Sequence, residues 1–449
     1  MVRIPRAVLP LLCLLAFSPP AQAHRRPRLP SPPLHPRVVQ VPVEDPTGHS
    51  LDAFGAALER ARTRRGQARI AVWGASHTAG DLYTGLLRRE LQARYGDAGH
   101  GFIQAGHPWR YFRHSDVNVA SSNGWVKDRV EAHDEPCAVP AVPASRANGP
   151  ASPANGRAPP CPDRSPVRRD GLYGLAGVSV RSSSPDDWTR FSTTRDNAVG
   201  RRASTIEAWF LRQPGGGSFD VRIDGRLART VATAGDAPAP GCTAFRLADR
   251  GHTVELRPRG DGEVRLFGIV MERAVPGVIL DTLGIPGSRA EFLLKWDPAL
   301  FLHQVQGRRP DLVVLAYGTN EAGDDHVPID EYERWLHEVV TRVRHAAPQA
   351  SCLLIGPTDR PLESPDGTWL PRPRRAEVTA VQRRVAFDRG CAFFDAAAMM
   401  GGEGGMDGWV GAQPPLASRD HVHLTREGYE IMGRMLLREL LLRTGQATP

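Results

Sequence analysis

Hydrophobic residues recur along this chain with two different periods, and the positions where the period changes mark the predicted domain boundaries. Short aliphatic and β-branched runs alternate with apolar positions at helical spacing in two separate segments. The predicted strands are 69–72, 278–280, 311–316, 352–355 and 391–394, and the predicted helices are 51–64, 82–95, 330–345, 375–389 and 425–443, with another helix after residue 287. Strands alternating with helices predict an α/β fold with a doubly wound, five-stranded parallel sheet.

Between these two segments the apolar residues follow a period of two. The alternating runs are 178–181, 205–210, 219–223, 253–256 and 264–267, with turn signals at 215–217 and 224–225. Short strands at such spacing are typical of a β-sandwich or jelly roll. We therefore expect an α/β domain formed by 51–105 and 276–449, interrupted by a β-sandwich domain at 106–275. The glycine-rich stretch 96–106 is expected to be a loop, and the Pro/Ala-rich stretch at about 138–168 a disordered one.

The N-terminus has the pattern of a secretory signal peptide. Arg3 and Arg6 precede a short apolar run, and a small-x-small site ends at Ala23. We expect cleavage after Ala23, a Pro/Arg-rich linker over 24–50, and a periplasmic or secreted bacterial protein. The apolar run is too short to span a membrane, and Cys13 lies away from the cleavage site, which argues against a lipoprotein.

The net charge limits the classes of partner that we expect. The formal net charge is +8, which favours an anionic partner such as a wall polymer, or simply a solvated basic surface. The basic residues form no lysine-rich stripe with aromatic residues, so we expect no nucleic-acid partner.

No cysteine spacing is typical of a metal site. The cysteines after the leader, which export would allow to form disulfides, are Cys137, Cys161, Cys242, Cys352 and Cys391. Pairs 137–161 and 352–391 are possible, with Cys242 left over.

Residues suited to nucleophilic catalysis follow several predicted strands. Ser76 stands in a tight strand-to-helix turn after the first strand, where small neighbours leave its hydroxyl accessible. Asp420 and His423 stand in one loop just before the last helix. His423 can act as general base to Ser76, and Asp420 can orient its ring. Alone, a serine in such a turn is more often a helix cap, and such a histidine more often packs or faces solvent.

Two further loops carry donors for an oxyanion. The backbone N–H groups of Ser76 and Gly287 and the side-chain amide of Asn320 can donate to a tetrahedral intermediate. Gly284 is a rival to Gly287, which we prefer because a helix opens just after it. The aromatic and basic segment with Trp109, Arg110 and Tyr111 is a tentative substrate-binding site for a sugar, or else packs the seam between the domains.

These blocks resemble the SGNH (GDSL) hydrolase family. The resemblance rests on 74–76, Gly287, 318–321 and the Asp-x-x-His at 420–423. It implies a three-layer α/β/α fold, Ser76 as nucleophile, Gly287 and Asn320 as oxyanion donors, His423 as base and Asp420 as its orienter. Within the family, the sequence 76–81 and the large insert are similar to bacterial O-acetylpeptidoglycan esterases, whose insert resembles a carbohydrate-binding module. Ala75 stands where the family usually has Asp.

The expected function is an exported serine esterase that removes O-acetyl groups from a cell-wall glycan such as peptidoglycan, without a metal or cofactor and as a monomer. Three alternatives remain open. The same triad can transfer the acetyl group to a sugar hydroxyl. A metal-dependent hydrolase would use His77, Asp81, Asp420, His421 and His423, although an H-x-H pair is a poor ligand set by itself. A glycan-binding protein with a decayed site has Ala75 as its support.

Overall fold

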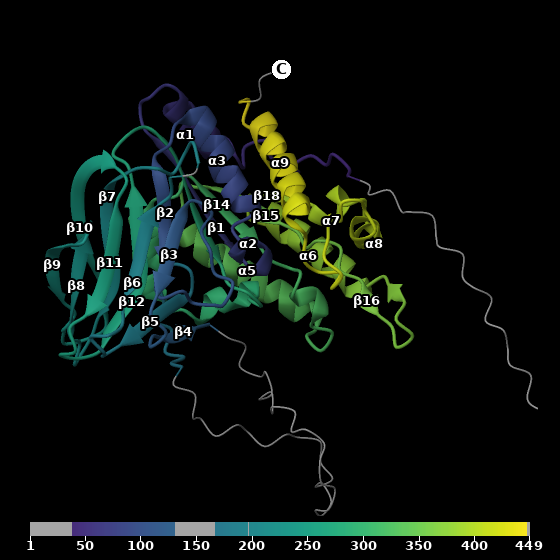
Figure 1. Ribbon diagram of the computed structural model, residues 1–449. Coiled ribbons are helices and arrows are strands. Elements are labelled where there is room, and N and C mark those ends of the chain that lie inside the picture. Colours follow the sequence, from purple (N-terminus) through teal and green to yellow (C-terminus); the bar gives the residue numbers. More distant parts are fainter. Residues whose placement is uncertain (1–37, 131–166, 196, 447–449) are drawn as a thin grey trace, which may run out of the picture.

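The computed structural model describes residues 38–130, 167–195 and 197–446. A β-sandwich and an α/β domain lie side by side in it (Figure 1). The predicted leader, Cys137, Cys161 and nearly all of the Pro/Ala-rich stretch lie outside the described residues. No helix among the described residues is long and apolar enough to cross a bilayer.

The parallel sheet is confirmed, with its strands in the order β13-β1-β14-β15-β18. These strands are β13 (Gly277–Gly284), β1 (Gln67–Gly74), β14 (Leu312–Ala316), β15 (Ser351–Ile355) and β18 (Ala392–Phe394). Every neighbouring pair is parallel. All five correspond to the strands that the sequence predicts, because each is a short run buried on both faces, as a covered parallel sheet requires.

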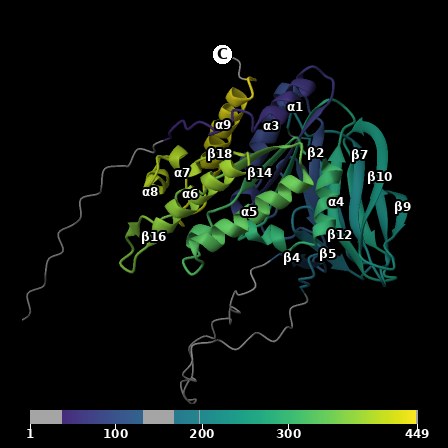
Figure 2. The ribbon, with the colours of Figure 1, turned by 180° about the vertical axis from the view of Figure 1, so that it is seen from behind.

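Helices cover both faces of this sheet (Figures 1 and 2). Along β1, Ile70 and Val72 face one hydrophobic core, while Ala71 and Trp73 face the other. The first core is closed by α1 (Asp52–Arg62), α3 (Tyr83–Tyr95), α9 (Arg426–Arg443) and the short helices α7 (Ala396–Met399) and α8 (Gly405–Val410). The second is closed by η1 (Ala290–Lys295), α4 (Pro298–Arg308), α5 (Ile329–Ala346) and α6 (Pro373–Asp388).

The insert is a β-sandwich of two antiparallel sheets. One has the order β10-β7-β12-β5-β4 with β2 also on β12, and the other β3-β6-β11-β8-β9. The strands are β2 (Gly99–Gln104), β3 (Val117–Ser121), β4 (Val126–Arg129), β5 (Val178–Ser182), β6 (Thr189–Thr193), β7 (Ala203–Arg212), β8 (Ser218–Ile223), β9 (Arg226–Ala232), β10 (Ala239–Arg250), β11 (Thr253–Pro258) and β12 (Val264–Glu272). Phe210 and Phe219 meet between the sheets, with ring centroids 5.3 Å apart.

The expectation that 96–106 is a loop is wrong, because β2 lies inside it and pairs with β12. The glycines that favour a loop reading serve close packing instead. A Cβ on Gly101 would lie 2.3 Å from the Asp281 carboxylate, so the strand can cross β13 only without a side chain there. Since β2 belongs to the insert's sheet, we propose Gly99 as the start of the insert.

A buried ionic network joins the two domains. Arg308 of α4 binds Asp281 of β13 and Glu272 of β12, and Glu272 also binds Arg69 of β1. The second core continues across the same seam, because it also includes Phe102 of β2 and Trp209 of β7 from the insert. The insert is therefore packed firmly against the α/β domain.

The cysteines of the sheet form one disulfide. Cys352 and Cys391 are bonded and lie at the starts of the neighbouring strands β15 and β18. This confirms one of the two pairs that the sequence allows. Cys242 of β10 is a free, exposed thiol.

Candidate active site

Ser76 is the first residue of the short helix α2 (Ser76–Ala79), directly after β1 and near the centre of Figure 1. The turn between them is very tight. A Cβ on Gly74 would lie 2.2 Å from Thr78 Oγ1 and 2.7 Å from the carbonyl oxygen of Ala316, so only glycine fits. Ser76 remains partly exposed. Its hydroxyl is thus presented at the carboxyl edge of the sheet, as the sequence predicts.

The loop before α9 brings a histidine and a carboxylate to this hydroxyl. His423 Nε2 lies 2.9 Å from Ser76 Oγ, and His423 Nδ1 lies 2.7 Å from Asp420 Oδ2. Asp420 Oδ1 also accepts the backbone N–H groups of Val422 and His423, which folds the loop around the carboxylate. Partial burial raises the pKa of Asp420, but these hydrogen bonds outweigh it and hold the pKa below its ordinary value. The nucleophile–base–carboxylate geometry is complete.

The predicted oxyanion donors lie on neighbouring loops. Gly287 has φ +75° in a turn closed by the Ser288 N–H on the Ile285 carbonyl, which is a type II geometry. The Asn320 side-chain amide donates to the Ser288 carbonyl at 2.8 Å. An amide has two N–H bonds, so one ties the two loops together and the other stays available to a substrate.

A buried glutamate holds these loops in register. Glu321 accepts the N–H of Gly318 at 2.9 Å and that of Ala290 at 2.8 Å. Burial raises the pKa of Glu321 despite these donors. Arg289 and Asp324 add a bidentate ion pair between the same loops. The sequence analysis names Glu321 as part of a motif but gives it no role.

Gly284 and Gly287 have different surroundings. A Cβ on Gly284 would lie 2.2 Å from the Ala79 nitrogen, so this glycine allows β13 to pack against α2. At Gly287 a Cβ would meet nothing within 4 Å. Gly284 therefore has a packing role, and the preference for Gly287 as a donor stays a prediction.

His77 is buried directly behind the nucleophile. Its Nδ1 lies 2.8 Å from the hydroxyl of Tyr429, and its Nε2 lies 3.4 Å from Thr358 Oγ1. Burial, followed by repulsion from the His423 ring, lowers the pKa of His77 to about 3. A neutral His77 packs the site without competing for the proton of Ser76.

The five residues of a metal-dependent reading do not come together as one ligand set. Asp81 is buried on Arg88, His77 binds Tyr429, and His421 lies 3.5 Å from Asp407 and stacks on Trp369. Across the described ranges, no three acidic, histidine or cysteine side chains are grouped so that they could hold an ion.

The aromatic segment lies at the seam between the domains. Trp109 and Phe112 meet edge to face, with centroids 5.2 Å apart. Both line a small cavity that Ala79 and Gly284 also line, next to α2. Tyr111 is 77% exposed, and the Arg110 guanidinium lies over its ring. Trp109 thus packs at the seam, as the alternative expects, and a sugar contact at Trp109, Arg110 and Tyr111 stays a prediction.

Ala75 does not prevent the site from forming. It is buried at the N-terminal end of α2, with its side chain in the second core and without a capping side chain. The hydrogen bond between Ser76 and His423 is present nonetheless.

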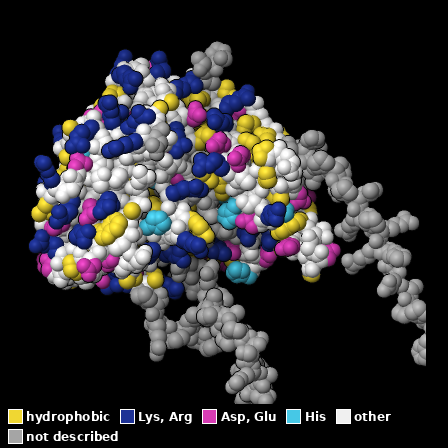
Figure 3. Space-filling model, viewed as in Figure 1, with side chains coloured by type: hydrophobic (Ala, Val, Ile, Leu, Met, Phe, Trp, Pro, Cys, Tyr) yellow, Lys and Arg dark blue, Asp and Glu magenta, His cyan; other side chains and the backbone are white. Residues whose placement is uncertain are grey.

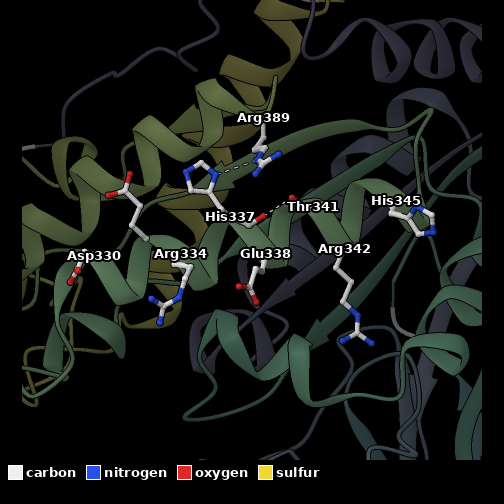
Figure 4. A pocket seen from close by; sticks show the side chains of 9 residues that line it. Asp330, Arg334, His337, Glu338, Thr341, Arg342, His345 and Arg389 are labelled. Carbon is white, nitrogen blue, oxygen red and sulfur yellow. Dashed lines mark hydrogen bonds between the residues drawn. The ribbon is translucent and has the colours of Figure 1, made fainter.

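A broader hollow lies elsewhere, along α5. Figure 4 shows Asp330, Arg334, Glu338 and Arg342 projecting from this helix. Acidic and basic groups alternate there, and the groove is wide open to solvent. Its one hydroxyl side chain, Thr341, donates to the His337 carbonyl and faces no base. Basic side chains are likewise scattered over the face seen in Figure 3 rather than gathered in a stripe. The Ser76 loops, by contrast, bring a hydroxyl, an imidazole and a carboxylate into one hydrogen-bonded row.

Comparisons with known proteins agree with this site. Residues 248–431 match the model of the GDSL-like lipase/acylhydrolase family, a range that includes Gly287, Asn320, Asp420 and His423 but not Ser76. No curated protein sequence matches at the significance required. The separation of Ser76 from the matched range follows from the insert between β1 and β13.

Among solved structures, one described as a peptidoglycan O-acetylesterase has a TM-score of 0.67 and 23% identity, covering 90% of this chain and 99% of that one. Family two carbohydrate esterases from Clostridium thermocellum and Cellvibrio japonicus each share 13% identity over 60% of this chain, covering 96% and 92% of theirs, with TM-scores of 0.28. Only the first is similar in overall fold. Residues 248–431 are therefore similar to the GDSL-like lipases and acylhydrolases, and the overall fold is similar to that of the first structure.

Proposed function

We propose that this chain is an exported serine esterase that hydrolyses O-acetyl esters on a cell-wall glycan such as peptidoglycan. The observation that carries the proposal is the continuous hydrogen-bonded path from Ser76 through His423 to Asp420. A serine is a weak nucleophile at its free pKa and needs a base held in this way.

In the first step, Ser76 Oγ attacks the acetyl carbonyl carbon while His423 Nε2 takes the hydroxyl proton. The carbonyl oxygen becomes an oxyanion, which the N–H groups of Ser76 and Gly287 and the Asn320 amide stabilise. Removing one such donor costs about 3–4 kcal/mol in hydrolases. Asp420 stabilises the His423 cation that forms.

In the second step, the intermediate expels the sugar alkoxide, which takes the proton back from His423 and leaves an acetyl ester on Ser76. Water then attacks this ester and gives its proton to His423. The second oxyanion collapses, Ser76 Oγ regains the proton, and acetic acid leaves and loses its proton to solvent as acetate. The balance needs water alone, and a sugar hydroxyl in place of that water would make the reaction a transfer.

Four observations support an acetylated wall glycan as substrate. The solved structure with the same overall fold is described as a peptidoglycan O-acetylesterase. The N-terminal sequence is typical of an export signal, and the net charge of +8 favours an anionic polymer. The β-sandwich insert packs beside the site, where it can contact a long substrate.

The test is acetate release from O-acetylated peptidoglycan by the chain from residue 24 on, beside Ser76→Ala and His423→Ala. We expect release by the parent and a loss of about 10⁴-fold or more in each variant. Full activity of Ser76→Ala would exclude the mechanism. If the parent cleaves only a chromogenic acetate ester, the triad stands and the substrate does not. Product analysis with an added sugar acceptor separates hydrolysis from transfer. Silence on both esters, with glycan binding retained, would favour a binding protein.

A further inference from the structure

The loop after β15 passes along the nucleophile and carries an arginine into the site. It begins at Gly356-Pro357, directly after β15, at the same edge of the sheet as the loops after the other strands. Thr358 contacts His77, the residue next to Ser76. Two residues later, Nη1 of Arg360 donates to the backbone carbonyls of Thr319 and Asn320. Arg360 thus stands between the nucleophile turn and the Asn320 loop.

Packing holds this guanidinium in place. It lies against Gly323, where a Cβ would come within 2.7 Å of Nη1 and 3.0 Å of Nη2. Only the missing side chain of Gly323 leaves room for the group. Arg360 is itself partly exposed, so the guanidinium is fixed from one side and reaches solvent.

The free edge of Arg360 distinguishes it from its neighbours. Arg289 uses Nε and Nη2 to bind both oxygens of Asp324, and Arg372 lies 3.3 Å from Asp325. Arg360 has no ion pair among the described residues, and its Nε and Nη2 donate no hydrogen bond there. Neither nitrogen belongs to the buried polar atoms left without a partner, so both are open to solvent.

Burial is the main influence on the charge of Arg360. It lowers the pKa of Arg360, the cations of Arg372 and Arg289 lower it too, and the carboxylates of Asp324 and Glu321 oppose them without forming an ion pair with it. A guanidinium never loses its proton in a protein, so a bound anion would compensate this partly buried charge. The Nε–Nη2 edge matches the two oxygens of a carboxylate.

We propose that the Nε–Nη2 edge of Arg360 binds a carboxylate of the glycan, so that the esterase selects acetylated sugars that carry an acidic group. The inference rests on the proposed function, because it places the anion beside the acetyl ester that Ser76 attacks. It adds a substrate-binding residue that the sequence motifs do not contain.

The test compares two substrates that differ at the carboxyl group, an O-acetylated N-acetylmuramic acid and its uncharged carboxyl methyl ester. We expect the parent to prefer the acid, and Arg360→Gln to lower the ratio of kcat/KM for acid over methyl ester by about 10- to 100-fold, mainly through KM, since hydrogen bonds to charged groups carry such energies. Arg360→Lys should fall between them, because it keeps the charge and loses the fork. Arg372→Gln is the matched control, with the same charge change nearby.

Three outcomes would overturn the inference. An equal loss on both substrates through kcat would make Arg360 a positioning residue for Asn320. An equal change of the ratio in Arg372→Gln would assign selectivity to general positive charge. A ratio near one in the parent would exclude carboxylate recognition. If no ester is cleaved at all, the proposed function fails separately. Calorimetry with the unacetylated sugar acid then still decides whether Arg360 binds it, by comparing the parent with Arg360→Gln.

Discussion

Two aspartates flank the nucleophile helix, and they are used in opposite ways. Asp420 lies in the loop before α9, with its side chain 50% exposed, and binds the 43% exposed side chain of His423. Asp81 follows α2 and is paired with Arg88, and these side chains are 1% and 0% exposed. The first pair lies beside solvent, and the second lies within the seam between the domains.

The two aspartates differ in whether their surroundings allow a proton to be exchanged: those of Asp420 and His423 do, whereas Asp81 is fixed in a buried network. Asp81 binds Arg88 and also accepts from Thr84, Ser115 and Thr282, so that it ties α3, the segment before β3, and β13 together. Such a network has no room for a proton to enter or leave. The Asp420–His423 pair keeps its partners within one short loop and leaves His423 Nε2 for Ser76. A catalytic carboxylate must polarise a base that changes charge, whereas a structural one must not change.

The largest effect that would sharpen this comparison is on activity. Asp420→Asn should lower kcat by about 10³- to 10⁴-fold, because an amide cannot hold the His423 tautomer or stabilise its cation. The free energy of unfolding should change by less than about 1 kcal/mol, since the side chain is half exposed. Acetate release and urea unfolding of the same sample measure both.

Asp366→Asn is the matched control for Asp420→Asn. Asp366 is also in an exposed loop and accepts side-chain and backbone donors, from Ser364 and Thr368. Its replacement should leave kcat unchanged. A kcat of Asp420→Asn close to that of the control would remove Asp420 from the triad.

The next effect is on stability. Asp81→Asn should lower the free energy of unfolding by about 3 kcal/mol, because the buried Arg88 guanidinium then keeps Asp116 as its one carboxylate partner among the described residues. Asp81 has φ +47°, and asparagine tolerates this region, so the change removes charge without adding backbone strain. The kcat of the folded variant should fall far less than in Asp420→Asn.

The same variant has a pH signature. Burial raises the pKa of Asp81, but Arg88 lowers it further, so the folded-state pKa lies below the ordinary value. Its contribution to stability is therefore present above the ordinary pKa and is lost as the pH falls. The free energy of unfolding should fall less steeply below about pH 4 in Asp81→Asn than in the parent. Equal slopes would contradict the depressed pKa, and Glu90→Gln, at an exposed ion pair, is the control.

Local sequence patterns were sufficient to predict the strands of the parallel sheet and the loops that follow them. The five parallel strands are continuous apolar runs, and each site loop follows its strand directly, as with Ser76 after β1. The pair Cys352–Cys391 follows from two neighbouring strand starts.

What the sequence did not provide depends on contacts between distant residues. Strand β2 pairs with β12 far along the chain, and its glycines give it a low β-propensity, so the sequence does not predict it. Arg360 belongs to no motif, because its position depends on contacts with Gly323 and with the Asn320 loop, which follows another strand. The seam around Arg88 and Arg308 is equally nonlocal, since single arginines give no signal of burial.

The smallest effect concerns Gly287, whose N–H is proposed as an oxyanion donor. Gly287→Ala keeps that N–H, and its Cβ meets nothing within 4 Å, but φ +75° costs an L-residue about 1 kcal/mol. Gly402→Ala is the matched control, with φ +81° and equally open space in a loop before α8. We expect both variants to lose similar stability, and only Gly287→Ala to lose about 3- to 10-fold in kcat, because relief of the strain displaces the donor. The same kcat in both variants would show that the Gly287 turn does not face the reacting carbonyl. The Gly287 loop would then have a structural role, as Asp81 has, and no part in the reaction.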